Sequence, residues 1–147
     1  LAYLELSAVY HILDKDDLSG EMFEKARELV PVRADFMMAG VWQRFGFPER
    51  AIVSYQRHLE ADTADVEACY KLGGLYIQRK ELEKAIPLYL RIVKIDSSSA
   101  PGYVTLSNLY YETGQLQASK AALRKAIEID PEFVRQMTSA QPTYGQQ

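Results

Sequence analysis

The chain has 147 residues, 48% of them hydrophobic and 25% charged, which is the composition of a globular domain. Its net charge is −3 and its basic residues are scattered, which argues against nucleic acid as a partner. The single cysteine, Cys69, excludes an internal disulfide, and no apolar run approaches the roughly 20 residues that span a bilayer.

Apolar residues recur at helical spacing in eight stretches, and glycine and proline are sparse. In chain order, the predicted helices span residues 2–13, 19–30, 34–45, 48–61, 66–79, 82–95, 100–112 and 116–129. No segment alternates between apolar and polar residues with a period of two. The sequence therefore predicts an all-α fold.

The predicted helices form a repeat with a period of about 34 residues. Aromatic residues recur at Tyr10, Trp42, Tyr76 and Tyr110. A small residue lies three positions before each aromatic residue, at Ser7, Ala39, Gly73 and Ser107. Another small residue lies nine positions after each, at Ser19, Ala51, Ala85 and Ser119. Small residues on two helices allow their backbones to approach closely. Because one helical hairpin cannot bury its apolar faces alone, copies must stack.

This pattern of aromatic and small residues, with a proline at the end of the unit, resembles the tetratricopeptide repeat. The fourth copy carries it most fully, in Tyr103, Leu106, Ser107, Tyr110, Gly114, Leu123, Ala126 and Pro131. The resemblance implies a right-handed superhelix, an α-solenoid of about four antiparallel helix-turn-helix repeats. These span approximately residues 1–31, 32–65, 66–99 and 100–131. Residues 132–147 are predicted to form a short C-terminal helix and a disordered polar tail.

The first half of the chain departs from the family pattern. Asp35 stands where the family prefers an aromatic residue, and His58 stands where it prefers alanine. The first junction is two residues short, which predicts an altered packing angle between the first and second repeats. We expect His58 to pack at a repeat interface with its ring nitrogens partly in water.

Residues that could carry catalysis or hold a metal are few. His11 and His58 fall in different repeats and Cys69 occupies a core-facing position, so the sequence predicts no catalytic residue, no metal site and no cofactor. The acidic run at residues 14–17 lacks the glycine and the final glutamate of a calcium loop. We interpret it as a solvated turn with a helix N-cap.

In the resembled family, the first helix of each hairpin lines a concave groove that takes up peptides or helices. Helical periodicity then assigns the exposed stripe of each first helix. The residues expected to bind a partner are Arg33, Phe36, Gln43, Arg44, Tyr70, Lys71, Asn108 and Tyr111. The matching stripe on the first predicted helix is Leu1, Leu4, Ala8, His11 and Ile12. Aromatic and arginine side chains of this kind contribute most of the binding energy at interfaces.

The sequence therefore predicts a protein-binding scaffold rather than an enzyme. Co-chaperones of the family hold a partner's terminal carboxylate with a Lys-Asn clamp. Leu4 and Ala8 occupy those positions here, or Phe36 and Gly40 one repeat later, which argues against heat-shock chaperone tails as partners. Three alternatives stay open: self-association through uncapped repeat ends, a fragment of a longer array or larger enzyme, and a stripe that is simply solvated or contacts neighbouring repeats.

Overall fold

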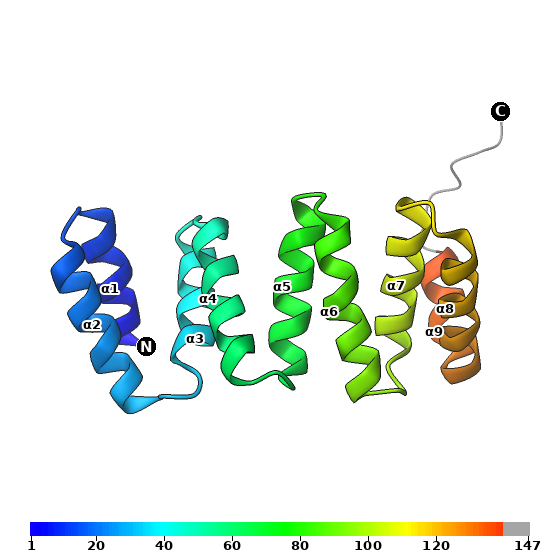
Figure 1. Ribbon diagram of the computed structural model, residues 1–147, viewed down its shortest axis with the longest axis horizontal. Helices are drawn as coiled ribbons and strands as arrows, with labels where there is room; N and C mark the ends of the chain where they lie inside the picture. Colours follow the sequence, from blue (N-terminus) through cyan, green and yellow to red (C-terminus); the bar gives the residue numbers. More distant parts are fainter. Residues whose placement is uncertain (140–147) are drawn as a thin grey trace. The chain divides into compact units, whose positions relative to one another are not determined.

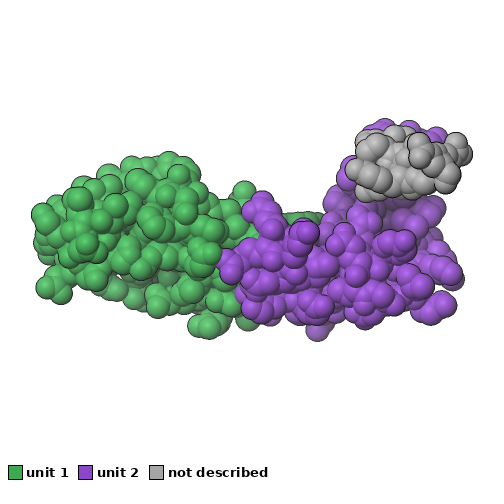
Figure 2. Space-filling model, turned by 90° about the horizontal axis from the view of Figure 1, so that it is seen from above, with its two compact units in different colours: residues 1–75 green, residues 76–147 purple. Residues whose placement is uncertain are grey.

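The structure, a computed structural model, describes residues 1–139, and every regular element in that range is an α-helix (Figure 1). The predicted all-α fold is confirmed. The chain divides into two compact units, residues 1–75 and residues 76–147, which Figure 2 shows in different colours. The predicted polar tail lies almost entirely outside the described residues.

Unit 1 contains two helical hairpins and most of a further helix. The helices are α1 (Ala2–Ile12), α2 (Asp16–Leu29), α3 (Ala34–Arg44), α4 (Pro48–Ala61) and α5 (Val66–Gln78), the last of which ends in unit 2. α2 begins three residues earlier than predicted. Asp16 and Asp17 lie in its first turn, where carboxylates interact favourably with the helix dipole. The expected N-cap is wrong, because no side chain caps this helix.

Unit 2 contains α6 (Leu82–Ile95), α7 (Ala100–Glu112), α8 (Leu116–Ile129) and α9 (Pro131–Ser139). α7 and α8 form a hairpin, α6 packs on α7, and α9 contacts both α7 and α8. The Ser99 hydroxyl caps α7 by accepting a hydrogen bond from the Gly102 N–H at 3.2 Å. Asp130 caps α9 by accepting from the Phe133 N–H at 2.9 Å. Pro131 starts α9, a position where its missing N–H costs nothing.

The small residues of the repeat lie at the closest approach of the paired helices. In the first hairpin, the Ser19 hydroxyl donates to the Ser7 carbonyl at 2.8 Å. In the hairpin of α7 and α8, the hydroxyls of Ser107 and Ser119 lie 3.1 Å apart. The equivalent residues of the second hairpin are Ala39 and Ala51, both fully buried. The serine contacts confirm the predicted close approach in two hairpins, and the burial of both alanines agrees with it in the second hairpin.

Each hairpin turns through one residue in the left-handed backbone conformation. These residues are Asp14 (φ 55°), Gly46 (φ 80°), Lys80 (φ 59°) and Gly114 (φ 78°). The residue after the left-handed one donates its backbone N–H to the carbonyl of the repeated aromatic residue. In the last hairpin, for example, the Gln115 N–H donates to the Tyr110 carbonyl at 2.7 Å. This is the Schellman closure of a helix C-terminus, for which glycine is the favoured residue. Two of the four turns therefore use a residue that adopts this conformation at a cost.

The face of α1 that is buried differs from the face that the sequence predicted to be buried. Leu4 and Ala8, assigned to the exposed stripe, are 1% and 0% exposed, so that assignment is wrong. The reason is that α1 packs against α3 as well as α2. Leu6, four residues before the repeated Tyr10, is 42% exposed.

Candidate functional site

Among the predicted contact residues on α3, Phe36 has an aromatic ring that lies partly in the core and partly at the surface. The Phe36 ring is half-buried, with its centroid 5.5 Å from that of Tyr55 and 5.4 Å from that of His58, both on α4. The Arg33 guanidinium lies over the same ring, 4.3 Å from its centroid. Phe36 thus attaches α3 to α4 and leaves only part of its surface for a partner.

The two stripe arginines form ion pairs with neighbouring helices. Arg33 Nη2 donates to Glu67 Oε2 of α5 at 3.2 Å, and Arg44 Nη2 donates to Glu5 Oε1 of α1 at 2.7 Å. All four side chains are largely exposed, and such pairs contribute at most about 1 kcal/mol. The arginines can therefore exchange these carboxylates for those of a partner at little cost.

Gln43 has a role in the fold that its exposed position did not indicate. Its Oε1 accepts a hydrogen bond from the Tyr55 hydroxyl at 2.9 Å. Tyr55 is 2% exposed, and burial raises the pKa of its hydroxyl to about 12, with the Glu67 carboxylate adding to the effect. The phenol therefore stays protonated, and Gln43 supplies the acceptor that the buried hydroxyl needs.

On α5, the stripe residues are the half-buried Tyr70 and the exposed Lys71. Gly74 follows Tyr70 by one turn, and Gly40 holds the equivalent position on α3. A β-carbon added at either glycine would meet nothing within 4 Å. The helix surfaces at both glycines are therefore open to the close approach of a partner's backbone.

The remaining two stripe residues lie on α7 in unit 2. Asn108 and Tyr111 are both exposed, and Tyr111 is 68% exposed, more than any other aromatic residue in the described chain. The structure thus places the predicted residues in two sets, six in unit 1 and two in unit 2.

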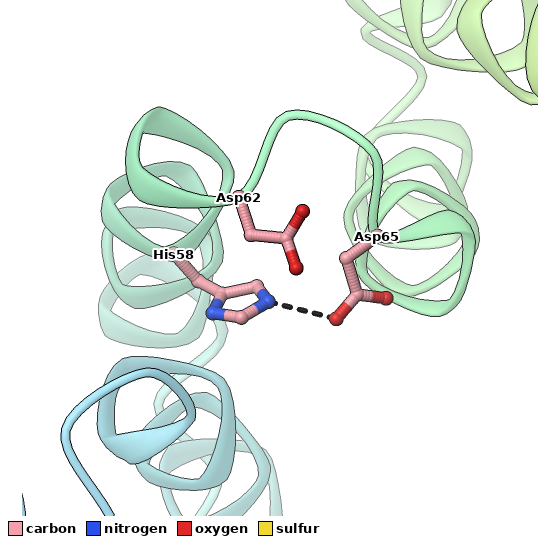
Figure 3. A group of neighbouring side chains, drawn as sticks. All are labelled: His58, Asp62 and Asp65. Carbon is pink, nitrogen blue, oxygen red and sulfur yellow. Dashed lines mark hydrogen bonds and ion pairs between the residues drawn. The ribbon is translucent and has the colours of Figure 1, made fainter.

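The most buried polar group of unit 1 is the imidazole of His58 (Figure 3). Its Nδ1 lies 3.1 Å from the carbonyl oxygen of Val32, and its Nε2 lies 2.8 Å from Asp65 Oδ2. The expectation of partly wet ring nitrogens is wrong, because two junctions of the chain converge on the ring. Both partners are acceptors, so both hydrogen bonds form together only when the ring is doubly protonated.

Asp65 connects this imidazole to the next helix. Its second oxygen, Oδ1, accepts a hydrogen bond from the Ala68 N–H at 3.0 Å in the first turn of α5. Burial is the largest influence and raises the pKa of this carboxyl. The hydrogen bonds from Ala68 and His58 and the nearby charges of His58 and Arg33 together outweigh burial, so that the pKa is lowered.

Among the described residues, one group has ligand atoms placed closely enough to hold a metal ion. It consists of His58, Asp62 and Asp65, whose ligand atoms all lie within 4.8 Å of one another. Hydrogen bonds account for this arrangement: His58 is bonded on both ring nitrogens, and Asp62 Oδ1 accepts from the Ala64 N–H at 3.1 Å. We therefore interpret the group as a structural clasp that joins α4 to the junctions on either side of it.

The comparisons with known proteins indicate one family. A family model described as the tetratricopeptide repeat matches residues 66–99 and 100–133. Residues 66–133 therefore carry two tetratricopeptide repeats. The resemblance stated from the sequence is thereby confirmed, and the search of the curated proteins found no match.

Solved structures show the same fold over most of the chain. The chain is similar to MamA, with 24% identity, 88% of this chain and 77% of that chain covered, and a TM-score of 0.65. For MamA from Desulfovibrio magneticus RS-1, the identity is 19%, the coverage 91% and 77%, and the TM-score 0.66. YrrB, described as a TPR protein with an unusual peptide-binding site, is 22% identical over 94% of this chain and 72% of that chain, with a TM-score of 0.65.

The tetratricopeptide repeat fold implies a protein-interaction scaffold with a protein or peptide partner. The described helices include none with the length and apolar character needed to cross a membrane.

Proposed function

We propose that this tetratricopeptide repeat chain is a non-catalytic scaffold that binds a peptide or a helix on the exposed stripe of its first helices. The proposed contact residues in unit 1 are Arg33, Phe36, Gln43, Arg44, Tyr70 and Lys71. Asn108 and Tyr111 on α7 of unit 2 supply further contacts of the same kind.

The observation that carries this proposal is the combination of exposed cations, partly exposed aromatic rings and open glycines on α3 and α5. Lys71 is exposed, and Arg33 and Arg44 form ion pairs at the surface. Gly40 and Gly74 leave room for a main chain to lie against the helices. Cations and rings then fix the side chains of that partner.

Peptides selected from a random library against the intact chain provide the test. Fluorescence anisotropy would measure the affinity of one selected peptide for the wild type and for variants Tyr70→Ala, Lys71→Ala and Tyr111→Ala. Tyr3→Ala is the matched control, because Tyr3 is an exposed tyrosine of α1 outside the stripe. We expect each stripe variant to bind about tenfold more weakly, as for an interface residue whose loss costs more than 1 kcal/mol. Equal affinity for all stripe variants would refute the proposal.

A second candidate function, self-association, is favoured by apolar residues exposed on the first hairpin. Leu6, Val9, Leu13 and Leu29 are all exposed, and Leu29 is 70% exposed. Contiguous exposed apolar surface is typical of protein contact sites. Light scattering across a range of concentrations distinguishes the two candidates. A constant mass of 16.7 kDa contradicts self-association, and a mass that grows with concentration supports it.

A further inference from the structure

A cleft lies between the two hairpins of unit 1. It has a volume of about 550 Å³ and is bordered mainly by residues of α2 on one side and of α3 and α4 on the other. Its apolar lining consists of Phe23, Met38, Trp42 and Val53. The volume lies in the range of clefts that hold small ligands or inserted side chains.

This cleft is separate from the stripe proposed above. Met38 and Trp42 are one turn apart on α3 and face the cleft, whereas Phe36 and Gly40 belong to the stripe. At 100° per residue, these two pairs lie on opposite sides of α3. A ligand in the cleft would therefore leave the stripe free.

A single small residue keeps the cleft open on the α2 side. Gly20 lines the cleft, and a β-carbon built on it would meet nothing within 4 Å. At the equivalent position, the next three hairpins have Ile52, Ile86 and Lys120. The opening is thus a property of the first hairpin and not of the repeat in general.

Two arginines on α4 give the cleft a cationic rim. The Arg50 guanidinium lies over the Trp42 ring, 5.1 Å from its centroid. Arg57, two turns further along α4, forms no ion pair or hydrogen bond with the described residues. One carboxylate, Glu49, is also present at the rim. An apolar floor with two guanidinium groups and one carboxylate at its rim suits an apolar side chain that has carboxylates beside it.

We propose that the cleft between α2 and α4 binds an acidic peptide segment of a partner protein, which inserts an aromatic or long aliphatic side chain between the hairpins. Arg50 and Arg57 pair with carboxylates on either side of the inserted residue. Phe23, Met38 and Val53 contact its apolar surface.

The test uses the intact chain and a short synthetic peptide in which aspartates flank a single phenylalanine. Trp42 is the only tryptophan of the chain, so its fluorescence reports directly on the cleft. We expect saturable binding of this peptide. Replacing the aspartates by lysines, or the phenylalanine by alanine, should weaken it about tenfold or more.

Two variants address the cleft, and one controls for the stripe. Gly20→Leu adds a side chain at the α2 side of the cleft, where its β-carbon has open space, and leucine favours the helix, so circular dichroism should show a retained fold while binding is lost. Arg57→Gln should weaken binding about tenfold, and Lys71→Ala should leave it unchanged. Unchanged peptide binding in both cleft variants would overturn the proposal. Loss of peptide binding in Lys71→Ala, with binding retained in Gly20→Leu, would also overturn it. Equal binding of the lysine peptide would also overturn it.

Discussion

Replacing His58 by alanine gives the sharpest test of the clasp in unit 1, because alanine is the residue that the family prefers there. The substitution removes the hydrogen bonds to the Val32 carbonyl and to the Asp65 carboxylate and the ring contact with Phe36. The His58 side chain is 0% exposed and that of Asp65 is 11% exposed, so solvent screens this pair little. Removal of the ring leaves the Asp65 carboxylate without this hydrogen-bond partner and leaves a cavity, and we expect a loss of about 3 kcal/mol.

Urea unfolding followed by Trp42 fluorescence measures this loss in unit 1, with circular dichroism as the second probe. Asp65→Asn is the matched partner variant, because asparagine can still cap α5 through the Ala68 N–H while the charge is lost. In the double variant the two losses should be less than additive by about 1–3 kcal/mol. Stability of His58→Ala within about 0.5 kcal/mol of the wild type, or above it, would refute the clasp.

Four further predictions concern pH and the backbone. Because the pKa of Asp65 is lowered in the fold, its contribution to stability is complete above the ordinary carboxyl pKa and is lost as the pH falls below about 4. The urea midpoint of the wild type should therefore fall in acid more steeply than that of Asp65→Asn. Gly102→Ala places a β-carbon 2.9 Å from Val93 Cγ1 and should lower the free energy of unfolding by about 1–3 kcal/mol. Gly74→Ala, which has open space, should raise it by up to about 1 kcal/mol. Lys80→Gly relieves a left-handed lysine (φ 59°) and should raise the melting temperature through a gain of about 1 kcal/mol, whereas a lowered value would contradict the turn analysis.

The sequence by itself determined the local structure and the hairpin contacts. Helical periodicity placed α3 to α8 to within a residue at each end, because the apolar spacing of each helix is contained in its own residues. The pairing of Ser7 with Ser19 and of Ser107 with Ser119 followed from the repeat, since equal spacing in equal hairpins produces equal contacts.

Only the tertiary structure decided which of the predicted stripe residues are available to a partner. Leu4 and Ala8 are buried because α1 packs on α3, a contact that the periodicity of one helix cannot specify. The same is true of Gln43, which holds the Tyr55 hydroxyl of another helix. Exposure depends on neighbouring helices, whereas periodicity describes one helix at a time.

The environment of His58 is the clearest case of contacts that the periodicity of a single helix cannot predict. Its acceptors are Val32, 26 residues earlier in the chain, and Asp65, seven residues later. The sequence identified His58 as a departure from the family and placed it at an interface. Its two hydrogen bonds depend on the convergence of two junctions, and that convergence is set by the packing of α2, α3, α4 and α5 rather than by the residues beside the histidine.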